Sequence, residues 1–204
     1  MTASNTGGSD SVAITLVVND VTPSSVVYGG SPYVLTNNSI MTADTPTSSG
    51  GSVVSWTISP SLPAGLTLDS STGEISGTPT ELSSLSTYTV TATNTGGSAT
   101  ATVTIVVNDV VPTVSYSPDD LSMTNDTVSS DLPLAPTLTG AGEVVSWTIS
   151  PALPNGLAFD TSTGVLSGTA MELLARTMFT INATNSGGTA TTYVNITVVD
   201  SIPT

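Results

Sequence analysis

Alternating apolar and polar residues run through short segments of this 204-residue chain, and Gly, Pro, Asn and Asp residues bound those segments. A period of two is typical of strands that have one buried and one solvated face. No segment carries apolar residues at helical spacing, and the best helical candidate, residues 171–177, is a single turn at most. The pattern predicts an all-β protein built from antiparallel strands.

Three segments carry the predicted core of a sandwich. In residues 53–58, Trp56 lies between Val54 and Ile58 on one face. The inward residues of the next two strands are Tyr88, Val90, Ala92 and Asn94, followed by Ala99, Ala101, Val103, Ile105 and Val107. The Thr-Gly-Gly sequence at 95–97 predicts a hairpin turn between these strands, because glycine adopts positive φ values without steric cost.

The chain is a tandem repeat. Residues 53–78 return with few changes as residues 144–169, and Trp56 and Trp147 lie 91 residues apart. A period near 90 residues is about the size of one β-sandwich and is too long for a solenoid turn. We therefore predict a Greek-key sandwich of about seven strands in each complete repeat.

Residues 1–20 match only the end of a repeat, which returns at residues 91–109. We expect residues 1–20 to be the terminal strands of an incomplete preceding repeat, and the sequence to be a piece of a longer protein. Complete repeats are predicted at residues 21–109 and 110–204. The segments that join them are short and contain proline, which favours limited bending.

The charge balance excludes several classes of partner. The chain has 15 Asp and Glu residues, one basic residue (Arg176) and no His, for a formal net charge of −14. Nucleic-acid binding needs several cationic contacts to phosphates, and an anionic lipid surface repels an acidic chain. No apolar run is long enough to cross a bilayer. We predict neither nucleic-acid binding nor membrane insertion for this segment, and the absence of cysteine excludes disulfides and thiolate metal sites.

An ordered series of motifs then points to a family. Both repeats contain Leu-Pro-x-Gly-Leu, Thr-Gly and Ser-Gly-Thr, then a strand with Tyr or Phe, then Ala-Thr-Asn-x-Gly-Gly and a Val-Val run before Asp. The series resembles the immunoglobulin-like, cadherin-like repeats of microbial surface proteins, which are related to domains of dystroglycan. The resemblance implies tandem β-sandwiches in an extracellular or cell-surface setting. It implies no ligand, because such repeats serve as spacers, adhesive modules and enzyme accessories.

The two tryptophans have two interpretations. Trp56 and Trp147 stand where immunoglobulin-like domains carry a core tryptophan, and their apolar neighbours on the same face include Val54 and Val145. A sugar-stacking platform would need an exposed ring. We predict that both rings are buried in the cores.

No catalytic residue is predicted. Asp69 and Asp160 precede Thr-Gly turns, where a carboxylate accepts backbone N–H groups. Glycosidase chemistry would pair Asp69 with Glu74, but the second repeat has Val165 in place of Glu74. Since the chain has no His, Lys or Cys, acid–base catalysis would depend on carboxylates or Tyr alone, and we expect no enzyme.

The borders between repeats have a metal-binding interpretation. Val-Asn-Asp-Val-x-Pro, at 18–23 and 107–112, resembles the calcium-binding linker of cadherins, although valine replaces two of its polar positions. Calcium prefers six to eight oxygen ligands, several of them carboxylates. The candidate calcium ligands are Asp20, Asp109, Glu81, Asp119 and Asp120. The alternative is that the border aspartates end a strand and turn the chain into the linker, and no cofactor is required.

Four sequons and one unpartnered strand complete the candidate sites. The candidate N-glycosylation sites are Asn37, Asn125, Asn182 and Asn195. The unpartnered apolar face consists of Val12, Ile14, Leu16 and Val18. An uncovered strand seeks a partner, so these residues could be donated to a neighbouring copy, unless they are simply the remainder of a truncated repeat.

The sequence therefore predicts a structural function. We expect a segment of a secreted or surface-displayed microbial protein whose immunoglobulin-like repeats form a stalk, adhesin shaft or filament, with neighbouring copies or repeats as partners. The alternative is a module that binds a glycan or a surface receptor through loops at one end of the sandwich. Those loops are residues 37–51 and 126–142, which differ between the repeats.

Overall fold

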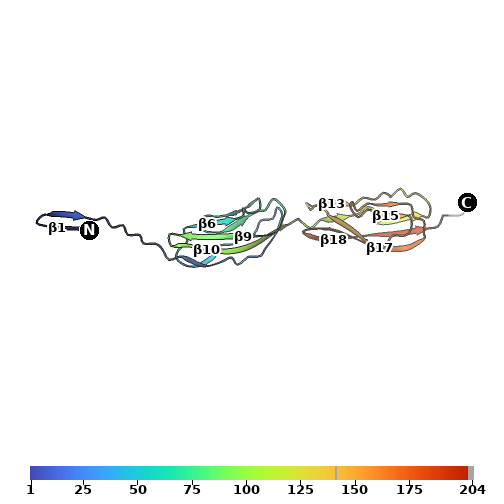
Figure 1. The fold of residues 1–204 in the computed structure, drawn as a ribbon. Helices are drawn as coiled ribbons and strands as arrows, with labels where there is room; N and C mark the ends of the chain where they lie inside the picture. Colours follow the sequence, from blue (N-terminus) through green and yellow to red (C-terminus); the bar gives the residue numbers. More distant parts are fainter. Residues whose placement is uncertain (141, 202–204) are drawn as a thin grey trace. The chain divides into compact units, whose positions relative to one another are not determined.

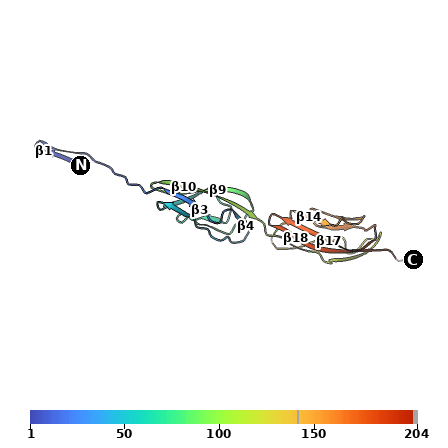
Figure 2. The same ribbon diagram turned by 90° about the horizontal axis from the view of Figure 1, so that it is seen from below.

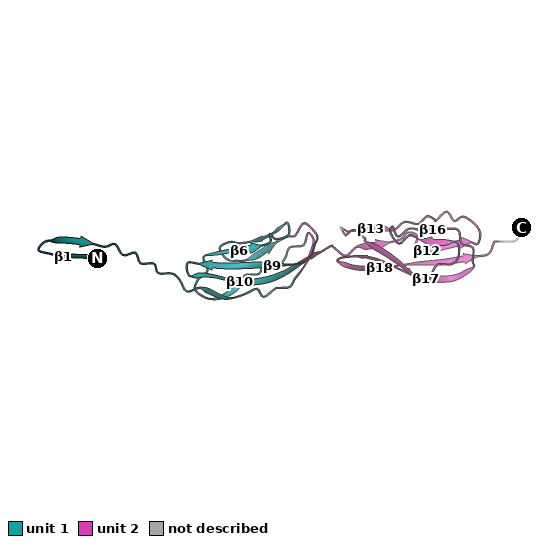
Figure 3. Cartoon of the chain, in the orientation of Figure 1, with its two compact units in different colours: residues 1–33, 41–77, 86–105 teal, residues 34–40, 78–85, 106–204 magenta. Residues whose placement is uncertain are grey.

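The computed structural model describes residues 1–140 and 142–201, and within these residues it contains strands and turns but no helix (Figure 1). Contacts divide the chain into two compact units (Figure 3). The first unit holds Met1–Tyr33, Met41–Gly77 and Ser86–Ile105, and the second holds Val34–Ile40, Thr78–Leu85 and Val106–Thr204. None of the described segments is a helix that could span a membrane.

The strands follow the repeats. A hairpin of β1 (Thr2–Asn5) and β2 (Gly8–Ser11) comes first. The first repeat contains β3 (Pro23–Val27), β4 (Tyr33–Thr36), β5 (Thr47–Gly50), β6 (Ser55–Ser59), β7 (Leu66–Leu68), β8 (Ile75–Gly77), β9 (Ser83–Asn94) and β10 (Gly97–Asn108). The second contains β11 (Thr113–Ser115), β12 (Asp120–Thr124), β13 (Thr137–Thr139), β14 (Ser146–Ser150), β15 (Leu157–Phe159), β16 (Leu166–Gly168), β17 (Leu174–Asn185) and β18 (Gly188–Val199).

Each repeat has one large sheet and two small ones. The large sheets have the strand orders β4-β10-β9-β6 and β12-β18-β17-β14. The smaller sheets are the pairs β3-β5 and β7-β8 in the first repeat, and β11-β13 and β15-β16 in the second. The long strands β9 and β10 lie side by side in both views (Figure 1, Figure 2). The predicted all-β, immunoglobulin-like fold is confirmed.

The number of strands differs from the prediction of about seven. Each repeat has eight, because its leading strand is divided in two. In the first repeat the segment YGGSP (28–32) separates β3 from β4, and the two strands join different sheets. Proline cannot donate a backbone hydrogen bond and glycine weakens a strand, so the ladder is interrupted between them.

Alternation places the core where the sequence predicts it, with one exception. Trp56 and Trp147 are 5% and 3% exposed, so the predicted burial of both rings is confirmed. The placement of Val54 and Val145 on the same inward face was wrong, because both side chains are exposed. β6 and β14 begin only after these valines, and Val144, the residue before Val145, packs against the core instead.

A buried tyrosine fastens the leading strand of each repeat to a distant turn. The hydroxyl of Tyr28 donates to the Gly73 carbonyl at 2.6 Å, and the hydroxyl of Tyr116 donates to the Gly164 carbonyl at 2.5 Å. Burial raises the pKa of both tyrosines, so the hydroxyls stay protonated and able to donate. The two equivalent bonds show that β3 and β11 hold the same place in their repeats.

Candidate functional site

The most repeated feature of the chain is a turn with the sequence Asn-Thr/Ser-Gly-Gly, which we name the glycine turn. It occupies residues 5–8, 94–97 and 185–188 and joins two antiparallel strands each time. In every copy the asparagine Oδ1 accepts the N–H of the first glycine at 2.8 Å, in the pairs Asn5 and Gly7, Asn94 and Gly96, and Asn185 and Gly187. The hairpins predicted from the Gly-Gly pairs are confirmed.

In the first repeat the glycine turn holds the leading segment, residues 20–22. The Asn94 Nδ2 donates to the carbonyl oxygens of Val21 at 2.7 Å and of Ser52 at 3.1 Å. The Thr95 hydroxyl donates to the Asp20 carboxylate at 2.6 Å, and the Asp20 N–H donates to the Thr95 Oγ1 at 3.0 Å. The point where the chain enters the repeat is thereby tied to the opposite end of its sequence.

The second repeat builds the same contact around residues 109–111. The Asn185 Nδ2 donates to the Val110 carbonyl at 2.7 Å, and the Asp109 N–H donates to the Ser186 Oγ at 2.8 Å. Asp109 is buried, and its second carboxylate oxygen accepts the Glu143 N–H at 3.1 Å. A buried carboxylate is stable only when it is paired or hydrogen-bonded. Here the backbone N–H groups of Val110 and Glu143 donate hydrogen bonds to it.

Close backbone approach explains the first glycine of these turns. A Cβ atom on Gly96 would overlap the Asp20 carbonyl oxygen, and one on Gly187 would overlap the Asp109 carbonyl oxygen. The sequence predicted the glycines from turn geometry alone. Their second purpose, leaving space for the leading segment, depends on residues some 75 positions away, as the bonds of Asp20 to Thr95 show.

The first glycine turn holds no leading segment. Asn5 is exposed, and a Cβ on Gly8 would meet nothing within 4 Å. The β1–β2 hairpin pairs Thr2 with Ser11, and residues 12–20 belong to no strand. The exposed fractions of the predicted donor side chains are 62% for Val12, 57% for Ile14, 87% for Leu16 and 93% for Val18. This apolar segment is therefore without cover in a single chain.

The candidate calcium ligands do not converge. Asp20 and Asp109 accept hydrogen bonds as described above, and Asp120 pairs with Arg176 at 2.9 Å on the surface. Glu81 and Asp119 are exposed. The described residues contain no group of three or more His, Cys, Asp or Glu that could hold a metal ion. Calcium binding at the repeat borders stays a prediction.

The four sequons fall into two classes. The Oδ1 atoms of Asn37 and Asn125 are buried without a hydrogen-bond partner. Asn182 and Asn195 are partly exposed on the outer face of the large sheet, where the Asn182 Oδ1 accepts the Thr191 hydroxyl at 2.8 Å. Glycosylation stays a prediction at all four sites. The loops 37–51 and 126–142 likewise remain candidates for glycan or receptor binding, with residue 141 outside the described residues.

The predicted aspartate turns are confirmed. The Asp160 Oδ1 accepts the Ser162 hydroxyl at 2.6 Å, the Ser162 N–H at 2.8 Å and the Thr163 N–H at 3.2 Å. These bonds, led by the one from the Ser162 side chain, lower the pKa of Asp160 to about 2. Asp69 has the same arrangement, and its pKa is lowered for the same reason. Each carboxylate therefore holds its turn in the ionised form.

This lowered pKa predicts a pH dependence. Because the folded pKa lies below the usual value of 3.8, the Asp160 carboxylate stabilises the fold above that value and loses this effect as the pH falls towards 2. In Asp160→Asn the amide oxygen keeps the acceptor but cannot titrate, so the advantage of the wild type over the variant should shrink between pH 5 and pH 2. Urea denaturation of both chains across this range measures it. Parallel pH profiles would contradict the assignment.

Comparison with known proteins identifies the family. The family model described as Putative Ig domain matches residues 13–108 and 111–199. Two similar proteins, both described as Serine-rich adhesin for platelets, come from Staphylococcus aureus strains N315 and MRSA252. They are 30% and 31% identical to this chain over 181 residues, which is 88% of the chain. The chain spans only 8% and 13% of their lengths.

A solved structure agrees on the fold. The extracellular domains 3-5 of Drosophila OTK match with a TM-score of 0.53 and 17% identity, covering 85% of this chain and 62% of that one. At this identity the likeness concerns the fold alone. The family match, by contrast, covers both repeats. This chain belongs to the Putative Ig domain family, of which it carries two copies in tandem.

Proposed function

We propose that this chain is a structural segment of a secreted or surface-displayed microbial protein, in which tandem immunoglobulin-like repeats transmit tension along a stalk, adhesin shaft or filament. The name of the staphylococcal relatives supports an adhesin setting at the cell surface. The observation that carries the proposal is the parallel pairing of the leading and final strands within a repeat.

Parallel pairing puts the second half of the divided leading strand beside the final strand of the same repeat. In the second repeat β12 pairs with the last five residues of β18, in register from Asp120 opposite Asn195 to Thr124 opposite Val199. Backbone bonds of 2.8 Å, from Asn195 N–H to Asp119 and from Asn125 N–H to Val199, continue the ladder. Pulling on the two ends drives these strands along each other in opposite directions. The ladder bonds must then break together, which raises the barrier to forced unfolding.

The first repeat has the same arrangement. β4 is the neighbour of β10 in the large sheet, and the Asn37 N–H donates to the Asn108 carbonyl at 2.8 Å, as Asn125 does to Val199. The glycine turns add a second attachment, because they bind the leading segment just before it enters the sandwich. A repeat built to bear tension would benefit from both features.

Force spectroscopy on the chain, held by its two ends, tests the proposal. N–H groups two residues apart on a strand point to the same edge, so Thr197 donates towards β12 as Asn195 does. Thr197→Pro should therefore lower the unfolding force of the second repeat. Thr191→Pro is the matched control, because its N–H points to the same edge where β12 does not reach.

Comparing the two variants distinguishes a loss of resistance to pulling from a general loss of stability. We expect one force peak for each repeat in the wild type and in Thr191→Pro, and a clearly weaker second-repeat peak in Thr197→Pro. Circular dichroism confirms that both variants are folded before pulling. Equal forces for the two variants, or a wild type that extends without peaks, would contradict a tension-bearing function.

The proposal also includes assembly of copies by strand donation. Residues 12–18 would be donated as a strand to a neighbouring copy, so that copies associate through main-chain hydrogen bonds. The support is the uncovered apolar segment described above, with Leu16 and Val18 almost fully exposed.

A further inference from the structure

We infer that the acceptor for the donated strand is the open edge of β10 in the first repeat, and that residues 12–18 of a second copy pair with it above a neighbouring groove. This inference rests on the assembly by strand donation in the proposed function and adds the surface that receives the strand. It is carried by an unpaired strand edge, a groove beside it, and differences between the two repeats at the same place.

The first half of β10 has no neighbour on one side. β10 is twelve residues long, but its neighbour β4 has only four residues, and the Asn37 bond to Asn108 places β4 at the far end of β10. The Ser31 Oγ accepts the Thr104 N–H at 3.2 Å, just before the paired part begins. Among the described strands, none flanks Gly97–Val103 on this edge. These backbone groups are available to an added strand.

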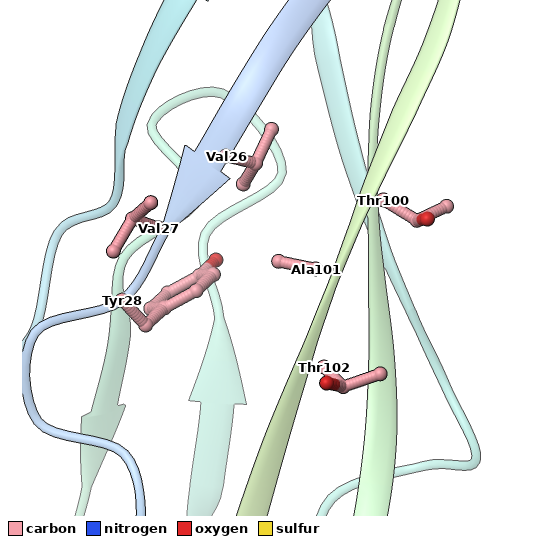
Figure 4. A pocket seen from close by; sticks show the side chains of 6 residues that line it. All are labelled: Val26, Val27, Tyr28, Thr100, Ala101 and Thr102. Atoms are coloured by element: carbon pink, nitrogen blue, oxygen red, sulfur yellow. The ribbon is translucent and has the colours of Figure 1, made fainter.

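A groove lies beside this edge. Its volume is about 390 Å³, and it is lined by Val26, Val27, Tyr28, Thr100, Ala101 and Thr102. Figure 4 shows the Ala101 side chain pointing towards Tyr28, while Thr100 and Thr102 point away from it. The small alanine leaves room over a floor formed by Tyr28 and Val26. A strand on the edge of β10 would direct every second side chain into this space.

The second repeat differs from the first at two of the groove positions. Counting from the equivalent glycine turns, Thr192 stands where the first repeat has Ala101, and counting from the buried tyrosines, Ser115 replaces Val27. A polar side chain at each place lowers the gain from burying an apolar strand. The second repeat therefore provides an internal control.

The leading strand also differs in shape. The pairing of β3 with β5 shifts register between Ser24 and Val27, and Ser25 has a φ of 50°. β11 pairs with β13 without a shift. A bulge bends its strand and disrupts the local ladder, so β3 has an irregular course along the groove where β11 is regular.

The donor matches this surface in pattern and charge. Val12, Ile14, Leu16 and Val18 alternate with other residues, and no charged residue lies between Asp10 and Asp20. The six groove residues are also uncharged. Because each chain has a net charge of −14, copies repel one another over most of their surfaces, and an uncharged contact is favoured as the place of approach.

The absence of native cysteine allows a direct test by single-cysteine crosslinking. Three donor variants, Val12→Cys, Ile14→Cys and Leu16→Cys, sample the register, and each is mixed under mild oxidation with a size-tagged Ala101→Cys chain. The control acceptor is Thr192→Cys, at the equivalent position of the second repeat. We expect at least one donor to give several-fold more mixed disulfide with Ala101→Cys than with Thr192→Cys. Equal yields for the two acceptors in every register would overturn the acceptor site.

Sedimentation velocity separates this result from failure of strand donation itself. Deletion of residues 1–18, which leaves Asp20 and its bonds to Thr95 in place, should abolish association between chains, and Ala101→Thr, which copies the second repeat, should weaken it several-fold in a folded chain. If the deletion abolishes association while Ala101→Thr and the crosslinks show no preference for the first repeat, donation stands and the acceptor is elsewhere. If association survives the deletion, strand donation itself is overturned.

Discussion

Replacing Trp147 with alanine is expected to lower the free energy of unfolding of the second repeat by about 3–5 kcal/mol, through lost burial and the cavity left behind. The ring is 3% exposed and lies in a core with Phe179 and Leu166, which are fully buried. A Cβ on Gly164 would touch the ring, so the turn above it packs closely and cannot easily fill the space. Trp56→Ala should have a similar effect on the first repeat, where Gly73 covers the ring.

The two tryptophans make the measurement simple. Each repeat contains one, so in Trp147→Ala the fluorescence of Trp56 reports the first repeat alone, and circular dichroism follows both during urea denaturation. Val145→Ala is the matched control, since this exposed valine precedes the same strand and should change stability by less than about 0.5 kcal/mol. A second-repeat transition that does not move in Trp147→Ala would contradict the burial argument.

Removing the amide of Asn94 should destabilise the first repeat by about 1–3 kcal/mol, the usual cost of leaving buried polar groups unpaired. Asn94→Ala takes away the donor to Val21 and Ser52 and the acceptor for Gly96. The asparagine is 8% exposed, so water cannot readily replace these bonds. Denaturation followed by Trp56 fluorescence in a Trp147→Phe background measures the change.

Asn5→Ala is a control that the chain itself provides. Asn5 makes the same bond to Gly7 in the same turn sequence, but it is exposed and holds no leading segment. The substitution at Asn5 should leave both repeats unchanged. If Asn94→Ala is equally silent, the leading segment is held by other contacts and the glycine turn is only a turn.

Local chemistry explains what could be predicted. The strands β9 and β10 follow from strict alternation, because a period of two places one set of side chains inside, and Val90, Val103 and Ile105 are fully buried as a result. The Asp160 turn could be predicted because the carboxylate accepts the N–H groups of Ser162 and Thr163, which are only two and three residues further along the chain. Such features depend on residues close in sequence. The same features occur in both repeats of the chain.

Val54 and Val145 show where this reasoning stops. Alternation holds only while the backbone is a regular strand, and both valines lie before their strands begin. The candidate sites were harder still. The sequence did not indicate that Asp109 accepts backbone N–H groups or that Asp120 pairs with Arg176. Which partner a carboxylate takes depends on what the fold brings near it.

The sequence by itself determined the all-β fold, the tandem repeats, the hairpins and the buried tryptophans, because periodicity, turn residues and burial of aromatic rings act over short distances along the chain. Only the tertiary structure decided that Asn94 and Asn185 hold the leading segments, that β12 runs parallel to β18, and that β10 keeps an open edge beside Ala101. The bonds of Asn94 and Asn185 and the pairing of β12 with β18 join residues some 75 positions apart. No local pattern records such pairings, since they arise when the packing of the whole sandwich decides which backbone groups meet.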